Sequence, residues 1–167
     1  NARKWERIAD SVIDPIMVDI SYWAWANRSD EMPVGMLDAA KNDLALIYNQ
    51  LERELSNSDY ICGELSIADI ALFPHMAGAT ALGVPFSKNS HKNIISWLAR
   101  LRANEIFSDD LCRVSDFVKN IETSNVERTK LFWRGERIEW VLAKGFDEWF
   151  FNEIKSDRVI WPPQLPI

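Results

Sequence analysis

Residues that commonly bind metal ions are scarce in this sequence. Its 167 residues include two cysteines, Cys62 and Cys112, and two histidines, His75 and His91. The cysteines lie far apart, whereas zinc-binding cysteines usually come in closely spaced pairs. We therefore predict no metal site, and we expect both thiols to be reduced and partly buried.

Positive charge is also in short supply. The chain has 19 lysines and arginines against 25 aspartates and glutamates, which gives a formal net charge of −6. Between residues 128 and 158 the basic residues are interleaved with acidic ones, so they form no cluster of one sign. A surface that binds nucleic acid needs clustered positive charge to neutralise the phosphates. The sequence therefore predicts no nucleic-acid partner.

Long apolar runs are absent. No stretch approaches the roughly 18 consecutive apolar residues of a membrane span, and from the first residues we expect no signal peptide. We expect no membrane partner and a cytoplasmic location. The chain starts at Asn1 rather than at a methionine, and a helical pattern is under way by Trp5, as expected of a fragment or a processed chain.

What the sequence does contain is apolar residues at helical spacing along most of its length. The pattern predicts helices at about residues 5–25, 34–55, 66–82, 93–103, 109–123, 128–143 and 147–154. Pro15 should bend the first helix near Val12, and Gly145 should cap the end of the sixth. The proline-rich end, residues 161–166, should be extended. Because no segment alternates apolar and polar residues for long enough to be a strand, the predicted fold class is all-α.

The third predicted helix begins with a capping box. The Ser66 hydroxyl should accept a hydrogen bond from the backbone N–H of Asp69, while the Asp69 carboxylate accepts one from the backbone N–H of Ser66. Such a cap is worth about 1–2 kcal/mol at the start of a helix. We therefore interpret Ser66 and Asp69 as a structural N-cap and not as catalytic groups.

The residues around this box resemble the C-terminal domain of the glutathione transferase family. Residues 60–75, Tyr-Ile-Cys-Gly-Glu-Leu-Ser-Ile-Ala-Asp-Ile-Ala-Leu-Phe-Pro-His, are similar to a signature in which a glycine precedes Ser/Thr-x-Ala-Asp and an apolar helix. Residues 94–103 and the following Phe107 resemble the family's Trp-Leu helix, although Glu105 and Ile106 replace its usual residue and proline. Two further segments, residues 7–15 and 132–140, resemble helices of bacterial members.

The resemblance implies an architecture. Residues 1–125 would form a bundle of five to seven helices, and residues 126–167 a C-terminal helical extension and tail packed on the same domain. The family also carries an N-terminal thioredoxin-like domain, which we expect to be absent from this chain because no βαβ pattern is present. By resemblance the full protein would be a homodimer that pairs through the first two helices of this domain.

The resemblance further implies where a substrate would lie. In the family, the first helix and the C-terminal extension form the wall of a pocket for a small apolar electrophile. The matching positions here are Ile13, Met17, Ser21 and Trp25. These side chains could instead pack against neighbouring helices or against the missing domain. We interpret Cys62 and His75 as structural residues, so we predict no catalytic residue in this chain.

Two functional hypotheses follow. In the first, the full protein is a glutathione transferase with glutathione as co-substrate, while this chain alone binds no cofactor and shows no turnover. In the second, the chain is a noncatalytic interaction module for protein assembly, because the same helical fold can serve unrelated functions.

Overall fold

The computed structural model describes residues 1–25, 31–122, 131–132 and 135–161. Its first helix runs from Ala2 to Trp25 in three parts, namely α1 (Ala2–Ile8), the π-helical segment η1 (Ala9–Ile13) and α2 (Asp14–Trp25). Pro15 explains the change, because it has no N–H to donate and its ring crowds the carbonyl one turn earlier. The change of helix geometry that Pro15 was expected to cause near Val12 is therefore a widened, π-helical turn.

The remaining helices follow the predicted order. They are α3 (Met36–Glu54), the short 3₁₀ turn η3 (Leu55–Asn57), α4 (Ile67–Gly78), α5 (Lys92–Arg102), α6 (Glu105–Glu122), α7 (Gly135–Ala143) and α8 (Asp147–Lys155). If α1, η1 and α2 are counted as one helix and the 3₁₀ turn η3 is left out, the described residues form seven helices. The all-α bundle predicted from the sequence is confirmed. None of the helices in the described part of the chain is long and apolar enough to cross a membrane.

Several helix boundaries differ from the sequence prediction. The fifth predicted helix begins at Glu105 and not near Asp109, because the Asn104 side chain caps it by accepting the N–H of Ile106 at 3.0 Å. Helix α4 ends at Gly78, earlier than predicted. Gly145 does cap α7, with a φ of 79°, as predicted.

The helix predicted over residues 128–143 is only partly correct. Within it, β1 (Leu131–Phe132) pairs in parallel with β2 (Val159–Ile160), and α7 starts at Gly135. Local spacing could not reveal this pairing, because the partner strand lies beyond two helices. Of the tail predicted to be extended, residues 162–166 lie outside the described part of the chain.

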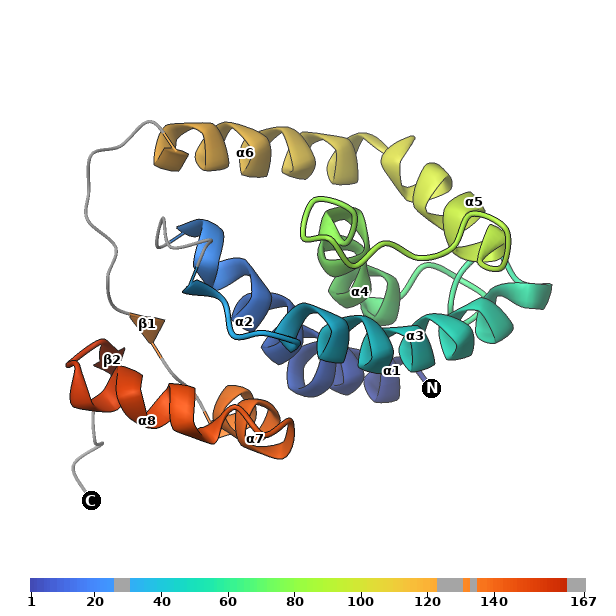
Figure 1. The fold of residues 1–167 in the computed structure, drawn as a ribbon. Helices are drawn as coiled ribbons and strands as arrows, with labels where there is room; N and C mark the ends of the chain where they lie inside the picture. Colours follow the sequence, from blue (N-terminus) through green and yellow to red (C-terminus); the bar gives the residue numbers. More distant parts are fainter. Residues whose placement is uncertain (26–30, 123–130, 133–134, 162–167) are drawn as a thin grey trace, which may run out of the picture.

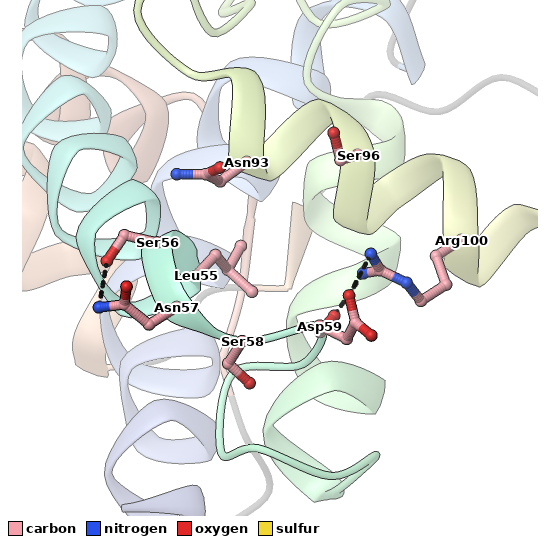
Figure 2. A pocket seen from close by; sticks show the side chains of 8 residues that line it. All are labelled: Leu55, Ser56, Asn57, Ser58, Asp59, Asn93, Ser96 and Arg100. Carbon is pink, nitrogen blue, oxygen red and sulfur yellow. Dashed lines mark hydrogen bonds and ion pairs between the residues drawn. The ribbon is translucent and has the colours of Figure 1, made fainter.

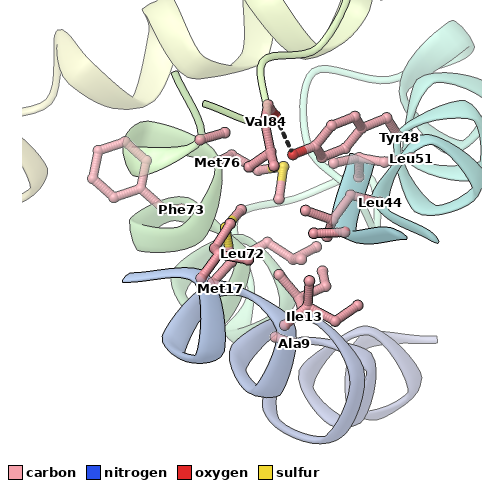
Figure 3. Close-up of a cluster of buried hydrophobic side chains, with 14 of the residues drawn as sticks. Ala9, Ile13, Met17, Leu44, Tyr48, Leu51, Leu72, Phe73, Met76 and Val84 are labelled. Carbon is pink, nitrogen blue, oxygen red and sulfur yellow. Dashed lines mark hydrogen bonds between the residues drawn. The ribbon is translucent and has the colours of Figure 1, made fainter. Parts of the chain in front are cut away.

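The core lies where the first helix meets α3 and α4 (Figure 3). The first helix contributes Ala9, Ile13 and Met17, and α3 and α4 add large apolar side chains from the opposite sides, among them Leu44, Leu51, Leu72, Phe73 and Met76. Tyr48 spans this core and donates its hydroxyl to the carbonyl of Val84 at 2.8 Å. Helix α5 closes the bundle through the fully buried Trp97.

The last two helices lie across the bundle from α6, against the side formed by α2 and α3 (Figure 1). Two carboxylates of the bundle hold α7 there. Asp19 of α2 pairs with Arg137, and Asp43 of α3 accepts from both Trp140 and Lys144. The aromatic rings of α2 and α8 also meet, because the centroids of Trp23 and Trp149 are 5.2 Å apart.

Candidate functional site

The start of α4 is organised around the buried carboxylate of Asp69, which has no exposed surface. Its Oδ2 accepts from the backbone N–H and the hydroxyl of Ser66, at 2.9 and 3.0 Å. Its Oδ1 accepts from the backbone N–H of Ile61 at 3.1 Å and from the indole N–H of Trp97 at 2.9 Å. The Ser66 hydroxyl in turn accepts from the N–H of Ala68, which completes the capping box.

This arrangement fits a structural role. A buried carboxylate is tolerated when its oxygens are fully hydrogen-bonded, and Asp69 meets that condition with four donors. The donors come from three places, namely the preceding loop, the α4 cap and helix α5. Asp69 therefore joins these elements, and its oxygens are already occupied by hydrogen bonds within the chain.

The residues predicted to line a substrate pocket lie in different environments. Ile13 and Met17 are 0% and 3% exposed and belong to the core (Figure 3). Ser21 is half-buried, and its hydroxyl donates to the carbonyl of Val18 at 2.9 Å. Trp25 ends α2, and its side chain lies outside the described structure. A pocket formed by these four residues stays a prediction. Among them, Ser21 is a partly exposed polar side chain that could contact a ligand.

Two histidines differ in their surroundings. His91 is buried, its Nδ1 accepts from the N–H of Ser87 at 2.9 Å, and its Nε2 lies 3.2 Å from Oδ1 of Asn49. His75 is half-buried on α4. Burial lowers the pKa of His75 below its usual value, while the carboxylates of Asp14 and Asp10 act in the opposite direction. The lowered pKa favours a neutral imidazole near pH 7.

The η3 turn that follows α3 and helix α5 border a polar pocket of about 400 Å³ that the sequence did not reveal (Figure 2). Its lining consists of Leu55, Ser56, Asn57, Ser58, Asp59, Asn93, Ser96 and Arg100. Arg100 binds both the carboxylate and the carbonyl of Asp59. The hydroxyls of Ser56, Ser58 and Ser96 donate to nearby backbone carbonyls. The polar groups of this pocket thus largely satisfy one another.

The N-terminus of α5, beside this pocket, is also occupied. The carboxylate of Glu52 accepts from the N–H groups of Asn93 and Ile94, at 3.0 Å each. A carboxylate at this position accepts hydrogen bonds from the free backbone N–H groups and interacts favourably with the positive end of the helix dipole. The end of α5 is therefore bound within the chain by a side chain of α3.

The most unusual polar contact is the ion pair between Asp19 and Arg137, which are 2% and 5% exposed. The guanidinium Nε donates to Oδ1 of Asp19 at 2.7 Å. The pKa of Asp19 is raised to about 7. Burial is the main cause and Asp14 adds to it, while the nearby Arg137 acts in the opposite direction. The sequence holds one hint of this contact, because Asp19 is an acidic residue placed between the apolar residues Val18 and Ile20 in the middle of a helix.

Metal binding has no support in the described structure. Within residues 1–25, 31–122, 131–132 and 135–161, no group of three or more histidine, cysteine, aspartate or glutamate side chains could hold an ion. Cys62 is half-buried next to the α4 cap, as expected. Cys112 is exposed on α6, so the expectation that both thiols are partly buried is wrong for this residue.

Comparisons with known proteins bear on the identity of this bundle. A family model described as glutathione S-transferase, C-terminal domain, matches residues 22–105, which is just over half of the chain. The matched region includes α3, the capping box, α4 and the Trp97 helix. Searches of curated proteins and of solved structures gave no match. The family model covers just over half of the chain, and the buried cap of α4 lies within the matched region. The chain therefore belongs to the family of glutathione S-transferase C-terminal domains.

Proposed function

We propose that this chain is the helical half of a cytoplasmic glutathione transferase and shapes the pocket for a small apolar electrophile. The single observation that carries the proposal is the family match over residues 22–105. In the intact enzyme, an N-terminal thioredoxin-like domain would bind the co-substrate glutathione. A hydrogen-bond donor of that domain would stabilise the glutathione thiolate, which then attacks the electrophile.

Exposed apolar side chains at the start of α4 support the proposal that a second domain packs against this part of the bundle. Leu65, Ile67 and Ile70 at the start of α4 are exposed, and so is Val12 in the neighbouring η1 segment. Large apolar side chains gathered at a surface commonly mark an interaction site. We assign this surface to the thioredoxin-like domain, whose docking would bury it.

Helix α2 would supply the wall of the electrophile pocket. Ser21 would face the ligand together with Trp25, while Ile13 and Met17 would support that wall from the core. The contribution of such a wall is to hold the electrophile near the thiolate and to exclude water. The catalytic donor would lie in the other domain, so this chain alone should show no turnover. The intact protein would pair as a homodimer through the first helix and α3.

The proposal is tested with the full-length protein. Glutathione is added up to millimolar concentration while tryptophan fluorescence is recorded, and conjugation to an aryl chloride is then measured. A saturable fluorescence change together with conjugation supports the proposal. The 167-residue chain serves as the control, and turnover by this chain alone would contradict the assignment of the catalytic donor to the other domain.

The alternative function is a noncatalytic interaction module. It is favoured by α6, which exposes Ile106, Val114 and Phe117. The same titration separates the two functions, because an interaction module would give no saturable response to glutathione and no conjugation. Substitution of Phe117 by serine would then weaken partner binding, whereas an enzyme should keep its turnover.

A further inference from the structure

The extension formed by α7 and α8 is held to the bundle by acidic residues of the bundle and by two basic residues, Arg137 in α7 and Lys144 just after it. Two carboxylates contribute, Asp19 from α2 and Asp43 from α3. We propose that this attachment is pH-sensitive, with Asp19 holding a proton while the extension is docked, so that the extension loosens from the bundle as the pH rises.

The geometry around Asp19 carries the proposal. Oδ1 receives the hydrogen bond from Arg137 at 2.7 Å. Oδ2 is buried and has no hydrogen-bond partner among the residues that the structure describes. An ionised carboxylate shares its charge between both oxygens, so one of them is left both desolvated and unbonded. A proton on Oδ2 removes that charge, and Oδ1 can still accept from Arg137.

The other charged groups near the contact do not supply the missing partner. Asp14, on the same helix, repels the charge of Asp19. On α3, Asp43 is engaged by Lys144 at 2.7 Å. On α8, Glu153 forms a double hydrogen bond with Arg158, at 2.9 and 2.6 Å. Burial thus outweighs the attraction of Arg137 and raises the pKa of Asp19 to about 7 from its ordinary value of 3.8.

The direction of the pH effect follows from linkage. When the extension detaches, water reaches Asp19 and its pKa returns toward 3.8. The docked state therefore binds the proton more tightly, and the stabilisation is full below pH 3.8 and lost as the pH rises to about 7. Docking should be tightest in acid, should weaken toward neutrality, and should then level off.

Detachment would uncover a defined part of the bundle. Helix α7 packs on α2, and Trp149 of α8 contacts Trp23 of α2. Ser21 lies on the same helix, between Asp19 and Trp23. The extension thus covers part of α2, and the proton on Asp19 strengthens its attachment there.

Hydrogen exchange of the full 167-residue chain at pH 5.0 to 8.5 tests the proposal. Protection factors, corrected for the intrinsic effect of pH on exchange, are compared between α7–α8 and α3–α5. The opening constant of α7–α8 should rise about tenfold per pH unit between roughly pH 5 and 6.5 and level off above about pH 7.5. The protection of α3–α5 should show no such slope.

Two variants provide matched tests. Asp19→Asn has nearly the same shape but no titratable group, so the pH slope of α7–α8 should disappear. Asp43→Asn removes the other carboxylate of the interface, so opening should increase by a similar factor at every pH while the slope stays. Circular dichroism verifies that both variants are folded.

A measurement on the unaltered chain stands independently of the variants. The ¹³C signal of the Asp19 carboxyl group should titrate near pH 7. The proposal is overturned if this signal titrates below about pH 5, if α7–α8 opening stays constant or falls as the pH rises to neutrality, or if a folded Asp19→Asn variant keeps the slope.

Discussion

Trp97 donates its indole N–H to Oδ1 of Asp69 over 2.9 Å, and thereby ties the middle of α5 to the first turn of α4. The two residues are buried together, and the same oxygen also accepts from Ile61. The capping box is therefore more than a local device at one helix end. Its acidic member connects three segments of the chain through one carboxylate.

Asp69→Ala should destabilise the chain far more than Ser66→Ala. The first change leaves the buried N–H groups of Ile61 and Trp97 and the half-buried N–H of Ser66 without their acceptor, whereas the second removes one cap hydroxyl. We expect losses of about 3–5 kcal/mol and about 1 kcal/mol respectively in the free energy of unfolding. Urea denaturation followed by circular dichroism measures both. Equal losses would show that Asp69 acts only as a local cap.

The buried pair of Asp19 on α2 and Arg137 on α7 should respond differently to single and double substitutions. Arg137→Met alone leaves the buried Oδ1 of Asp19 without its hydrogen-bond donor, so a loss of about 1–3 kcal/mol in the free energy of unfolding is expected. Asp19→Leu combined with Arg137→Met replaces both polar side chains with apolar ones and should restore most of that loss. A double-mutant cycle in urea gives the coupling energy. Additive losses would contradict a direct interaction.

Tyr48 should make the fold sensitive to alkaline pH. Burial raises the pKa of Tyr48 well above its usual value. The stability it contributes is therefore present below pH 10, the value for an exposed tyrosine, and is lost as the pH rises further. Tyr48→Phe should cost about 1 kcal/mol at pH 7, through the lost hydrogen bond to Val84, and should weaken the decline in alkali. Urea denaturation at pH 7 and at about pH 11 compares the two chains.

Substitutions in the predicted pocket wall should fall into two groups, those that lower stability and those that change substrate binding. Ile13→Ala and Met17→Ala each leave a cavity in the core, so each should lose about 2–5 kcal/mol of stability. Ser21→Ala should change stability by less than about 0.5 kcal/mol. In the full-length protein, the same serine change should raise KM for the electrophile about two- to fivefold, through the loss of one polar contact. An unchanged KM would remove Ser21 from the pocket wall.

Features that depend on neighbouring residues could be predicted from the sequence. Ser66 and Asp69 stand three positions apart before an apolar helix, and Gly145 follows the last apolar residue of α7. The chemistry of each of these helix ends lies within a few residues of chain. The order of the helices could be predicted for the same reason, because helical periodicity is local.

Features that join distant segments could not be predicted. The pairing of β1 with β2 and the contact between Asp19 and Arg137 both need a partner that no local pattern specifies. The missed start of α6 has a different cause. The cap residue Asn104 lies before the apolar pattern begins, so helical spacing alone places the start of this helix too late. The polar pocket beside Arg100 forms only when the end of α3 meets α5.

The π-helical segment sets the orientation of the whole first helix. Trp5, Ala9, Ile13 and Met17 recur every four residues, a spacing that drifts around a regular helix of 3.6 residues per turn. The segment from Ala9 to Ile13 encloses one extra residue in its turn and so cancels that drift. All four side chains can then point to the same core. A homologous chain one residue shorter at this place could present the same faces with an uninterrupted α-helix.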